Sequence, residues 1–285
     1  NYLLMMFYTM VAGWMLNYFV YSLTGQLSGK NVEQIGGEFN NMLSTPSVMI
    51  FWTLVVVVIS ILVCSLGLQK GVEKISKVMM ILLFALMIIM AVNSLLLDGS
   101  SEGLKFYLVP DFSKMKEQGI GNVVFAAMSH AFFTLGLGIG SMEIFGSYLS
   151  RDCKLTGESI NVVILDTVVA LTAGIIIIPA CFAYGINPGA GPSLLFITLP
   201  NVFNQMPGGV IWEVLFFIFM AFAALSTVIA VYENIIAMTM DLFNCSRKRA
   251  SLVNLFVIAV LSMPAVLGYN VLSGVQPLGA GTTIM

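Results

Sequence analysis

The sequence contains very little charge. Only 9% of its 285 residues are Asp, Glu, Lys or Arg, whereas 59% are apolar, and the mean hydropathy is +0.97. Soluble domains usually carry about 25% charged residues, so this composition excludes an ordinary soluble fold, and its hydrophobicity excludes intrinsic disorder. A net charge of -2 provides no basic surface for nucleic acid. The remaining class is an all-α polytopic membrane protein.

Residues that commonly carry enzyme chemistry are also scarce. There is one His, no H-E-x-x-H and no G-x-S-x-G motif, and an isolated Asp within a span lacks the second carboxylate that acid–base proteolysis needs. We therefore expect a protein that is not an enzyme. The cysteines avoid the long connectors where a structural disulfide is expected, so we interpret them as free thiols: Cys64, Cys153, Cys181 and Cys245.

Seven segments have the length and apolarity of a membrane span, which takes about 20 residues. They cover residues 2–23, 48–68, 78–97, 123–148, 162–184, 210–240 and 252–268. The connectors after the second, fourth and sixth spans are short and hold eight of the twelve basic residues. The positive-inside rule then places these connectors in the cytoplasm, with the start of the chain inside and its end outside. The eight are Lys70, Lys74, Lys77, Arg151, Lys154, Arg247, Lys248 and Arg249.

The fourth predicted span contains three alternating glycines, Gly136, Gly138 and Gly140. Glycine weakens a helix by about 1 kcal/mol relative to Ala, so this run favours a break at mid-membrane. A break frees backbone groups that lipid cannot satisfy, and transporters use such helix ends to hold ions and anionic substrate groups. Close helix packing through small residues is the alternative.

Polar side chains inside the spans are the other functional candidates, because a charge at the bilayer centre costs about 2.5–3.5 kcal/mol. Asp166 lies between apolar runs, and either a functional role or a structural hydrogen bond to a neighbouring helix explains it. Glu143 fits a solvated or structural role, and His130 fits a structural hydrogen bond. Glu233 could pair with a helix dipole or a hydroxyl, and the sequence does not distinguish between these two partners.

The Ser226-Thr227 pair supplies two adjacent hydroxyls in the sixth predicted span. Each hydroxyl could bond a carbonyl of the preceding turn. Alternatively the pair could bind a hard cation such as Na⁺, which prefers oxygen ligands.

Together these features resemble the neurotransmitter:sodium symporter family, and specifically its bacterial amino-acid transporters with the LeuT fold. The similarity runs through ordered stretches that cover nearly the whole chain. They are Phe7-Tyr8, Ala12-Gly13-Trp14, residues 70–77, Pro110-Asp111-Phe112, residues 132–138, Gly146-Ser147-Tyr148, residues 196–200, Ser226-Thr227 and residues 246–249.

The resemblance implies about seven transmembrane helices of the LeuT inverted-repeat fold, namely family helices three to nine, with one broken at Gly136–Gly140. Residues 1–97 would end the first repeat and residues 122–285 would form most of the second. Residues 98–121 and 185–209 would be extracellular loops. The missing helices of the parent chain would precede Asn1 and follow Met285, so they count among the partners, together with the lipid bilayer and an amino-acid substrate.

The resemblance also implies site residues. Those for the substrate are Leu4, Tyr8, Phe133, Thr134, Gly136, Ile139, Thr227 and Val231, with Tyr8 on the carboxylate and Phe133 as a gate. Those for the first sodium are Thr134 and Asp166, and those for the second are Ala223, Ser226 and Thr227. Residues 196–200 would belong to the extracellular cap.

Two departures from the family pattern carry expectations. Many members have an amide at Asp166, and chloride-dependent relatives have a serine at Ala170. The resemblance implies two sodium ions, and these residues predict that no chloride is needed, with Asp166 as a fixed anion. The family's helix-five proline is replaced by Ile81, ten residues after Gly71, which favours a continuous helix.

The expected function is sodium-coupled symport of a hydrophobic amino acid, with aromatic ones among the candidates, across the inner membrane by alternating access. Two alternatives stay open: a truncated chain that only packs against other helices, and a cation channel.

Overall fold

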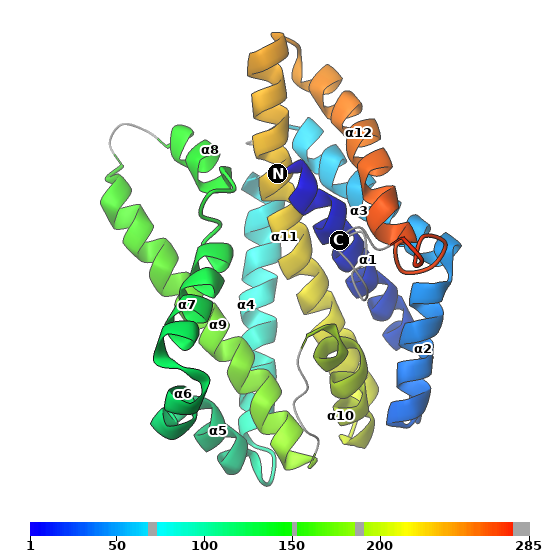
Figure 1. The fold of residues 1–285 in the computed structure, drawn as a ribbon, viewed down its shortest axis with the longest axis vertical. Helices are drawn as coiled ribbons and strands as arrows, with labels where there is room; N and C mark the ends of the chain where they lie inside the picture. Colours follow the sequence, from blue (N-terminus) through cyan, green and yellow to red (C-terminus); the bar gives the residue numbers. More distant parts are fainter. Residues whose placement is uncertain (68–72, 150–152, 186–190, 276–285) are drawn as a thin grey trace. The chain divides into compact units, whose positions relative to one another are not determined.

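The computed structural model describes residues 1–67, 73–149, 153–185 and 191–275, and these residues form helices without a strand (Figure 1). This confirms the all-α polytopic fold class. In chain order the elements are α1 (Tyr2–Leu23), α2 (Val32–Ser44), α3 (Pro46–Ser65), α4 (Lys74–Leu95), α5 (Ser100–Leu108), α6 (Phe112–Gln118), α7 (Ile120–Thr134), α8 (Ser141–Ser147), α9 (Leu155–Ala183), the π-helix η2 (Leu194–Thr198), α10 (Leu199–Gln205), α11 (Gly209–Phe243) and α12 (Arg247–Leu267).

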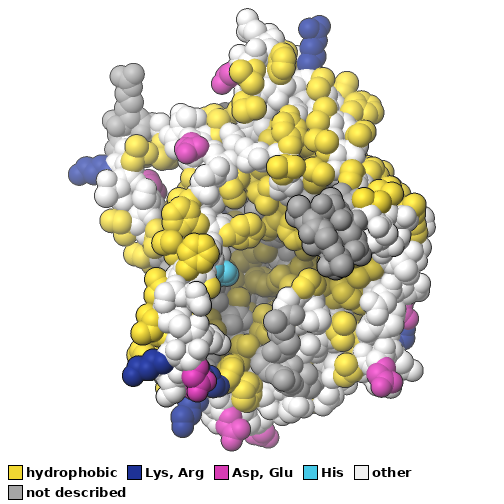
Figure 2. Space-filling model, in the orientation of Figure 1, with side chains coloured by type: hydrophobic (Ala, Val, Ile, Leu, Met, Phe, Trp, Pro, Cys, Tyr) yellow, Lys and Arg dark blue, Asp and Glu magenta, His cyan; other side chains and the backbone are white. Residues whose placement is uncertain are grey.

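Six helices among the described residues are long and apolar enough to cross a membrane: α1, α3, α4, α9, α11 and α12. They coincide with six of the seven predicted spans, and α4 continues through Ile81 as expected. Gly71 and the connector residues Lys70 and Arg151 lie outside the described residues. Hydrophobic side chains cover much of the face seen in Figure 2, as expected of helices that contact lipid.

The fourth predicted span, residues 123–148, is divided between α7 and α8, which confirms the predicted break. Its three glycines have φ values of 65°, 80° and 82°, in the left-handed region that residues with a Cβ rarely adopt. The chain therefore leaves the helix at residues 135–140.

The segments predicted to be extracellular loops contain short helices, and their extracellular location stays a prediction. Residues 98–121 hold α5 and α6, and residues 185–209 hold η2 and α10. Local signals start some of these helices: Asp111 accepts hydrogen bonds from the backbone N–H groups of Ser113 and Lys114 at 3.0 and 3.3 Å. Such helices are too short and too polar to register as spans.

The helices group into two compact units, residues 1–86 with 189–285 and residues 87–188. In the first unit α1 packs against α3, α11 and α12. Gly13 permits the contact with α3, because a Cβ there would lie 3.0 Å from the backbone of Trp52 and Thr53. Thr9 and Ser262 meet at 3.2 Å between α1 and α12. The predicted repeats at 1–97 and 122–285 divide the chain differently and remain a prediction.

An aromatic cluster fills the first unit between α1, η2 and α11. The Tyr18 ring lies 4.9 Å from Phe196 and 5.1 Å from Phe217, measured between centroids, and Phe39 of α2 stacks on Phe196 at 5.2 Å. Trp14 meets Phe196 edge-on at 5.7 Å. These rings join η2, part of the predicted cap, to the long helices of this unit.

In the second unit α5 packs along α9. A Cβ at Gly103 would lie 2.6 Å from the Pro179 Cα, so glycine is required for this approach. The Tyr107 hydroxyl reaches the carbonyl oxygen of Ala170 at 3.4 Å. Ser94, at the end of α4, donates to the carbonyl of Ile176 at 2.9 Å.

Candidate functional site

The break after α7 is a complete helix C-terminus. Gly136 has a left-handed φ, and its N–H donates to the carbonyl oxygen of Phe133 at 3.1 Å. The N–H of Leu137 donates to the carbonyl oxygen of Phe132 at 3.0 Å. These two bonds form a Schellman motif, which satisfies carbonyls that the helix would otherwise leave unpaired. Gly140, also left-handed, then starts α8. The sequence therefore stops one helix and starts another within six residues.

The predicted site residues of the second unit lie at this break and on α9. Phe133 and Thr134 end α7, Gly136 and Ile139 lie in the break, and Asp166 is half-buried near the middle of α9. The Thr134 hydroxyl donates to the carbonyl of Ala131 at 3.3 Å. No hydrogen bond joins Thr134 to Asp166 among the described residues, and Asp166 forms no ion pair with them.

The predicted ligands of the second sodium come together within one turn of α11. The Ser226 and Thr227 hydroxyls lie 2.8 and 3.3 Å from the Ala223 carbonyl oxygen. In this arrangement both hydroxyls donate to that carbonyl, as the structural interpretation of the pair anticipated. Three half-buried oxygens therefore occupy one small region of a membrane-spanning helix.

The remaining predicted substrate residues of the first unit are on α1 and α11, which pack together. Leu4 and Tyr8 are half-buried and one turn apart on α1, and Val231 is buried on α11. The Tyr8 hydroxyl has no hydrogen-bond partner among the described residues. The predicted substrate and sodium residues thus form two groups, one in each unit.

Glu233, whose role the sequence left open, forms an ion pair. Arg247, at the start of α12, donates to both carboxylate oxygens at 2.8 Å and to the Cys64 carbonyl at 3.0 Å. The Glu233 side chain is 0% exposed and that of Arg247 is 23% exposed. The ion pair therefore links α11 to α12, and Arg247 also joins both to α3. Glu143 and His130 are exposed on α8 and α7.

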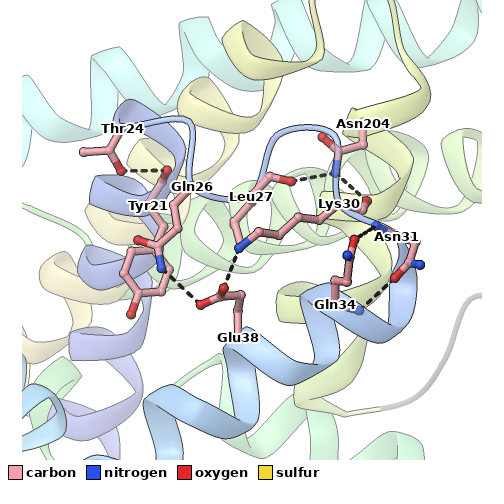
Figure 3. A network of polar contacts seen from close by, with 9 residues as sticks. All are labelled: Tyr21, Thr24, Gln26, Leu27, Lys30, Asn31, Gln34, Glu38 and Asn204. Carbon is pink, nitrogen blue, oxygen red and sulfur yellow. Dashed lines mark hydrogen bonds and ion pairs between the residues drawn. The ribbon is translucent and has the colours of Figure 1, made fainter.

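A polar network that the sequence did not indicate joins α10 to the turn between α1 and α2 (residues 24–31; Figure 3). The Asn204 amide donates to the carbonyls of Leu27 and Lys30 at 2.8 and 3.0 Å and accepts from the N–H of Gly29 at 3.2 Å. Lys30 also bonds Glu38, which lowers the pKa of that carboxyl. A single amide on α10 thus holds three backbone groups of this turn.

Glu213, on α11, was also missed. It is 1% exposed, and its Oε1 has no hydrogen-bond partner among the described residues. Its place three residues inside the predicted span 210–240 was the available signal.

Comparisons with known proteins bear on both units. A family model described as "Sodium:neurotransmitter symporter family" matches residues 30–276. An uncharacterized sodium-dependent transporter of Bacillus subtilis (strain 168), YhdH, is 36% identical over 98% of this chain and 61% of its own. A sodium- and chloride-dependent taurine transporter of Rattus norvegicus is 28% identical over 74% of this chain and 35% of its own.

A solved structure is also similar. The crystal structure of MhsT in complex with L-phenylalanine superimposes with a TM-score of 0.87 and 39% identity, covering 99% of this chain and 63% of that one. The chain therefore spans about three fifths of the length of YhdH and MhsT.

Proposed function

Because the chain belongs to the sodium:neurotransmitter symporter family, a family of membrane transporters and not of enzymes, we propose that the full-length protein is a sodium-coupled symporter of hydrophobic amino acids. Aromatic amino acids are among the proposed substrates, and the proposed location is the cytoplasmic membrane. Transport would proceed by alternating access, with inward sodium flow driving uptake.

The observation that carries the proposal is the group of three oxygens on α11. The Ser226 and Thr227 hydroxyls lie 2.8 and 3.3 Å from the Ala223 carbonyl oxygen, in a span with no basic residue nearby in sequence. Oxygen donors are what hard cations prefer, so this set fits sodium as a transported ion. When sodium enters, each hydroxyl can turn its proton away and present a lone pair.

A second group of proposed site residues lies at the break between α7 and α8 and on α9. Thr134 and Asp166 would bind the first sodium, and Phe133, Gly136 and Ile139 would face the substrate. A carboxylate beside a cation stabilises it, and a substrate carboxylate at the same ion would do likewise, so each ligand would raise the affinity for the other. This reciprocity would couple sodium binding to amino-acid binding.

The proposed substrate class follows from the side chains. Leu4, Phe133, Ile139 and Val231 are apolar and provide no charge for an acidic or basic substrate side chain, while Tyr8 offers a free hydroxyl for the carboxylate. The similar MhsT structure contains L-phenylalanine, which supports an aromatic substrate.

Uptake of labelled phenylalanine into proteoliposomes with an inward sodium gradient tests the proposal. We expect uptake to require the gradient. Ser226→Ala should raise the sodium concentration for half-maximal uptake by about tenfold, the effect of losing roughly 1.4 kcal/mol of ligand binding. Ser65→Ala, an exposed hydroxyl at the end of α3, should leave it unchanged. Uptake that ignores sodium, or current without amino acid, would reject symport.

The chain alone provides a second test, because it spans about three fifths of its similar relatives. We propose that it requires the family's remaining helices for transport. Liposomes that contain residues 1–285 alone should then show no sodium-dependent uptake, while the full-length protein transports. Uptake by the chain alone would reject this dependence.

A further inference from the structure

Glu213 is a buried acid that the proposed transport mechanism does not use. Its side chain is 1% exposed, and it forms no hydrogen bond or ion pair with any described residue. This contrasts with Glu233 on the same helix, whose two oxygens both bind Arg247. The protonation state of a carboxyl group in such surroundings therefore has to be explained.

The residues one turn away on α11 place Glu213 against α10 and α1. A Cβ at Gly209, four residues earlier, would lie 1.8 Å from the carbonyl oxygen of Phe203 on α10. Phe216, three residues later, packs on Phe203 at 5.5 Å, and Phe217, four residues later, packs on Tyr18 at 5.1 Å. Residues three and four apart share a helix face, so Glu213 lies on the face that these contacts cover.

No described cation neutralises Glu213. The titratable groups on the adjoining elements are phenols and two acids: Tyr2, Tyr8, Tyr18 and Tyr21 on α1, Tyr269 beyond α12, and Glu33 and Glu38 on α2. Lys30 bonds Glu38, while η2 and α10 contain no titratable residue. Arg247 binds Glu233 and the carbonyl of Cys64 at the end of α3. Glu233 lies about 30 Å from Glu213 along α11, at 1.5 Å per residue.

Ionisation of this carboxyl would leave an uncompensated charge in an apolar interior, which costs several kcal/mol, whereas the neutral acid costs far less. We propose that Glu213 is a proton-binding site, occupied in this conformation, and that release of its proton opens the contact between α10 and the turn at residues 24–31. Asn204, the residue after Phe203, makes that contact, so the site lies beside the segment it would control.

The sign of the effect follows from linkage. The closed contact binds one proton more than the open one, in which water reaches the carboxylate. Raising the pH therefore favours opening by up to tenfold per pH unit over the range in which the proton is released. The inference uses neither sodium nor an amino acid, so it is independent of the proposed transport function.

Electron spin resonance on the full-length protein in lipid nanodiscs tests the proposal. Spin labels at Ser28 and Gln205, both exposed, report the separation of the turn from α10 as the pH is raised. We expect a narrow distance distribution at low pH that broadens at high pH. Glu213→Gln, which keeps the size of a neutral acid, should remain narrow throughout, and the control Glu33→Gln, at an exposed acid of α2, should respond like the unsubstituted protein. An unchanged pH response in Glu213→Gln would overturn the proposal.

Infrared spectroscopy gives a second readout that does not depend on the labels. The unsubstituted protein should show a carbonyl band of a protonated carboxylic acid, which disappears as the pH rises and is lost in Glu213→Gln. If Glu213→Gln fails to assemble, the unsubstituted protein decides: absence of a titrating band would overturn the proposal, and its presence together with the distance change would support it.

Discussion

At the scale of single residues, Arg247 balances the charge of the Glu233 carboxylate buried on α11. It donates to both oxygens of Glu233, which is fully buried. Removing one partner of a buried pair leaves an uncompensated charge and costs about 3–5 kcal/mol. We expect Arg247→Ala to lower the stability of the purified protein by about that amount in denaturant unfolding followed by helix content.

The neighbouring arginine is a matched control. Arg249 is exposed two residues along the same helix, so Arg249→Ala should change stability by less than about 0.5 kcal/mol. Glu233→Gln together with Arg247→Ala should recover part of the loss, because no charge is then left buried. Equal effects of the two arginine substitutions would contradict a structural role for the pair.

Asn204 is a second single-residue determinant. Its side chain makes three hydrogen bonds with the turn at residues 24–31, each worth about 0.5–1.5 kcal/mol net. Asn204→Asp retains the acceptor for Gly29 but loses both donors. We expect faster amide hydrogen exchange in residues 24–31 for Asn204→Asp and faster still for Asn204→Ala, measured by mass spectrometry. Gln205→Ala, an exposed neighbour, should leave exchange there unaltered.

At the scale of secondary-structure elements, the packing of α5 on α9 depends on Gly103. The nearest atoms to a Cβ there belong to the α9 backbone, at 2.6 Å for Pro179 Cα and 3.0 Å for the Ile178 oxygen, so the two helices must separate. Overpacking of this kind costs about 1–3 kcal/mol. We expect Gly103→Ala to lower the thermal stability of the protein.

Gly157→Ala on α9 is the control, since a Cβ there has nothing within 4 Å. Alanine in an open helical position should stabilise by about 0.5–1 kcal/mol. Gly174 falls between these cases, because its close neighbour is the far end of the Tyr107 side chain, which can swing away. Destabilisation by Gly157→Ala equal to that of Gly103→Ala would show that glycine content, and not packing, matters.

The elements also show what sequence can predict. Long apolar helices such as α1 and the break at Gly136 were predictable, because hydropathy and the positive-φ tolerance of glycine are local properties. Helices α5 and α10 were missed, since they are short and mixed in polarity. The partner of Glu233 was not predictable either: Arg247 lies 14 residues away, and only tertiary packing brings the two together.

At the scale of the whole molecule, the few acids inside the spanning helices differ in how their negative charge is balanced. Three lie more than one turn from the ends of a spanning helix. Glu233 is neutralised by Arg247, we propose a proton for Glu213, and Asp166 has no ion pair among the described residues. An acid without a fixed protein partner is suited to a transported cation, which agrees with its predicted role beside Thr134.

This distribution of charge yields the prediction on chloride. If the Asp166 carboxylate supplies the negative charge beside sodium, no bound anion is needed, and Ala170 offers no hydroxyl to hold one. Uptake by the full-length protein should therefore persist when gluconate replaces chloride. Asp166→Asn should reduce sodium affinity at least about tenfold, because it removes a charged ligand worth more than ~1.4 kcal/mol, while Glu158→Gln at the exposed start of α9 should not. Loss of uptake in gluconate, or full sodium affinity in Asp166→Asn, would contradict this role.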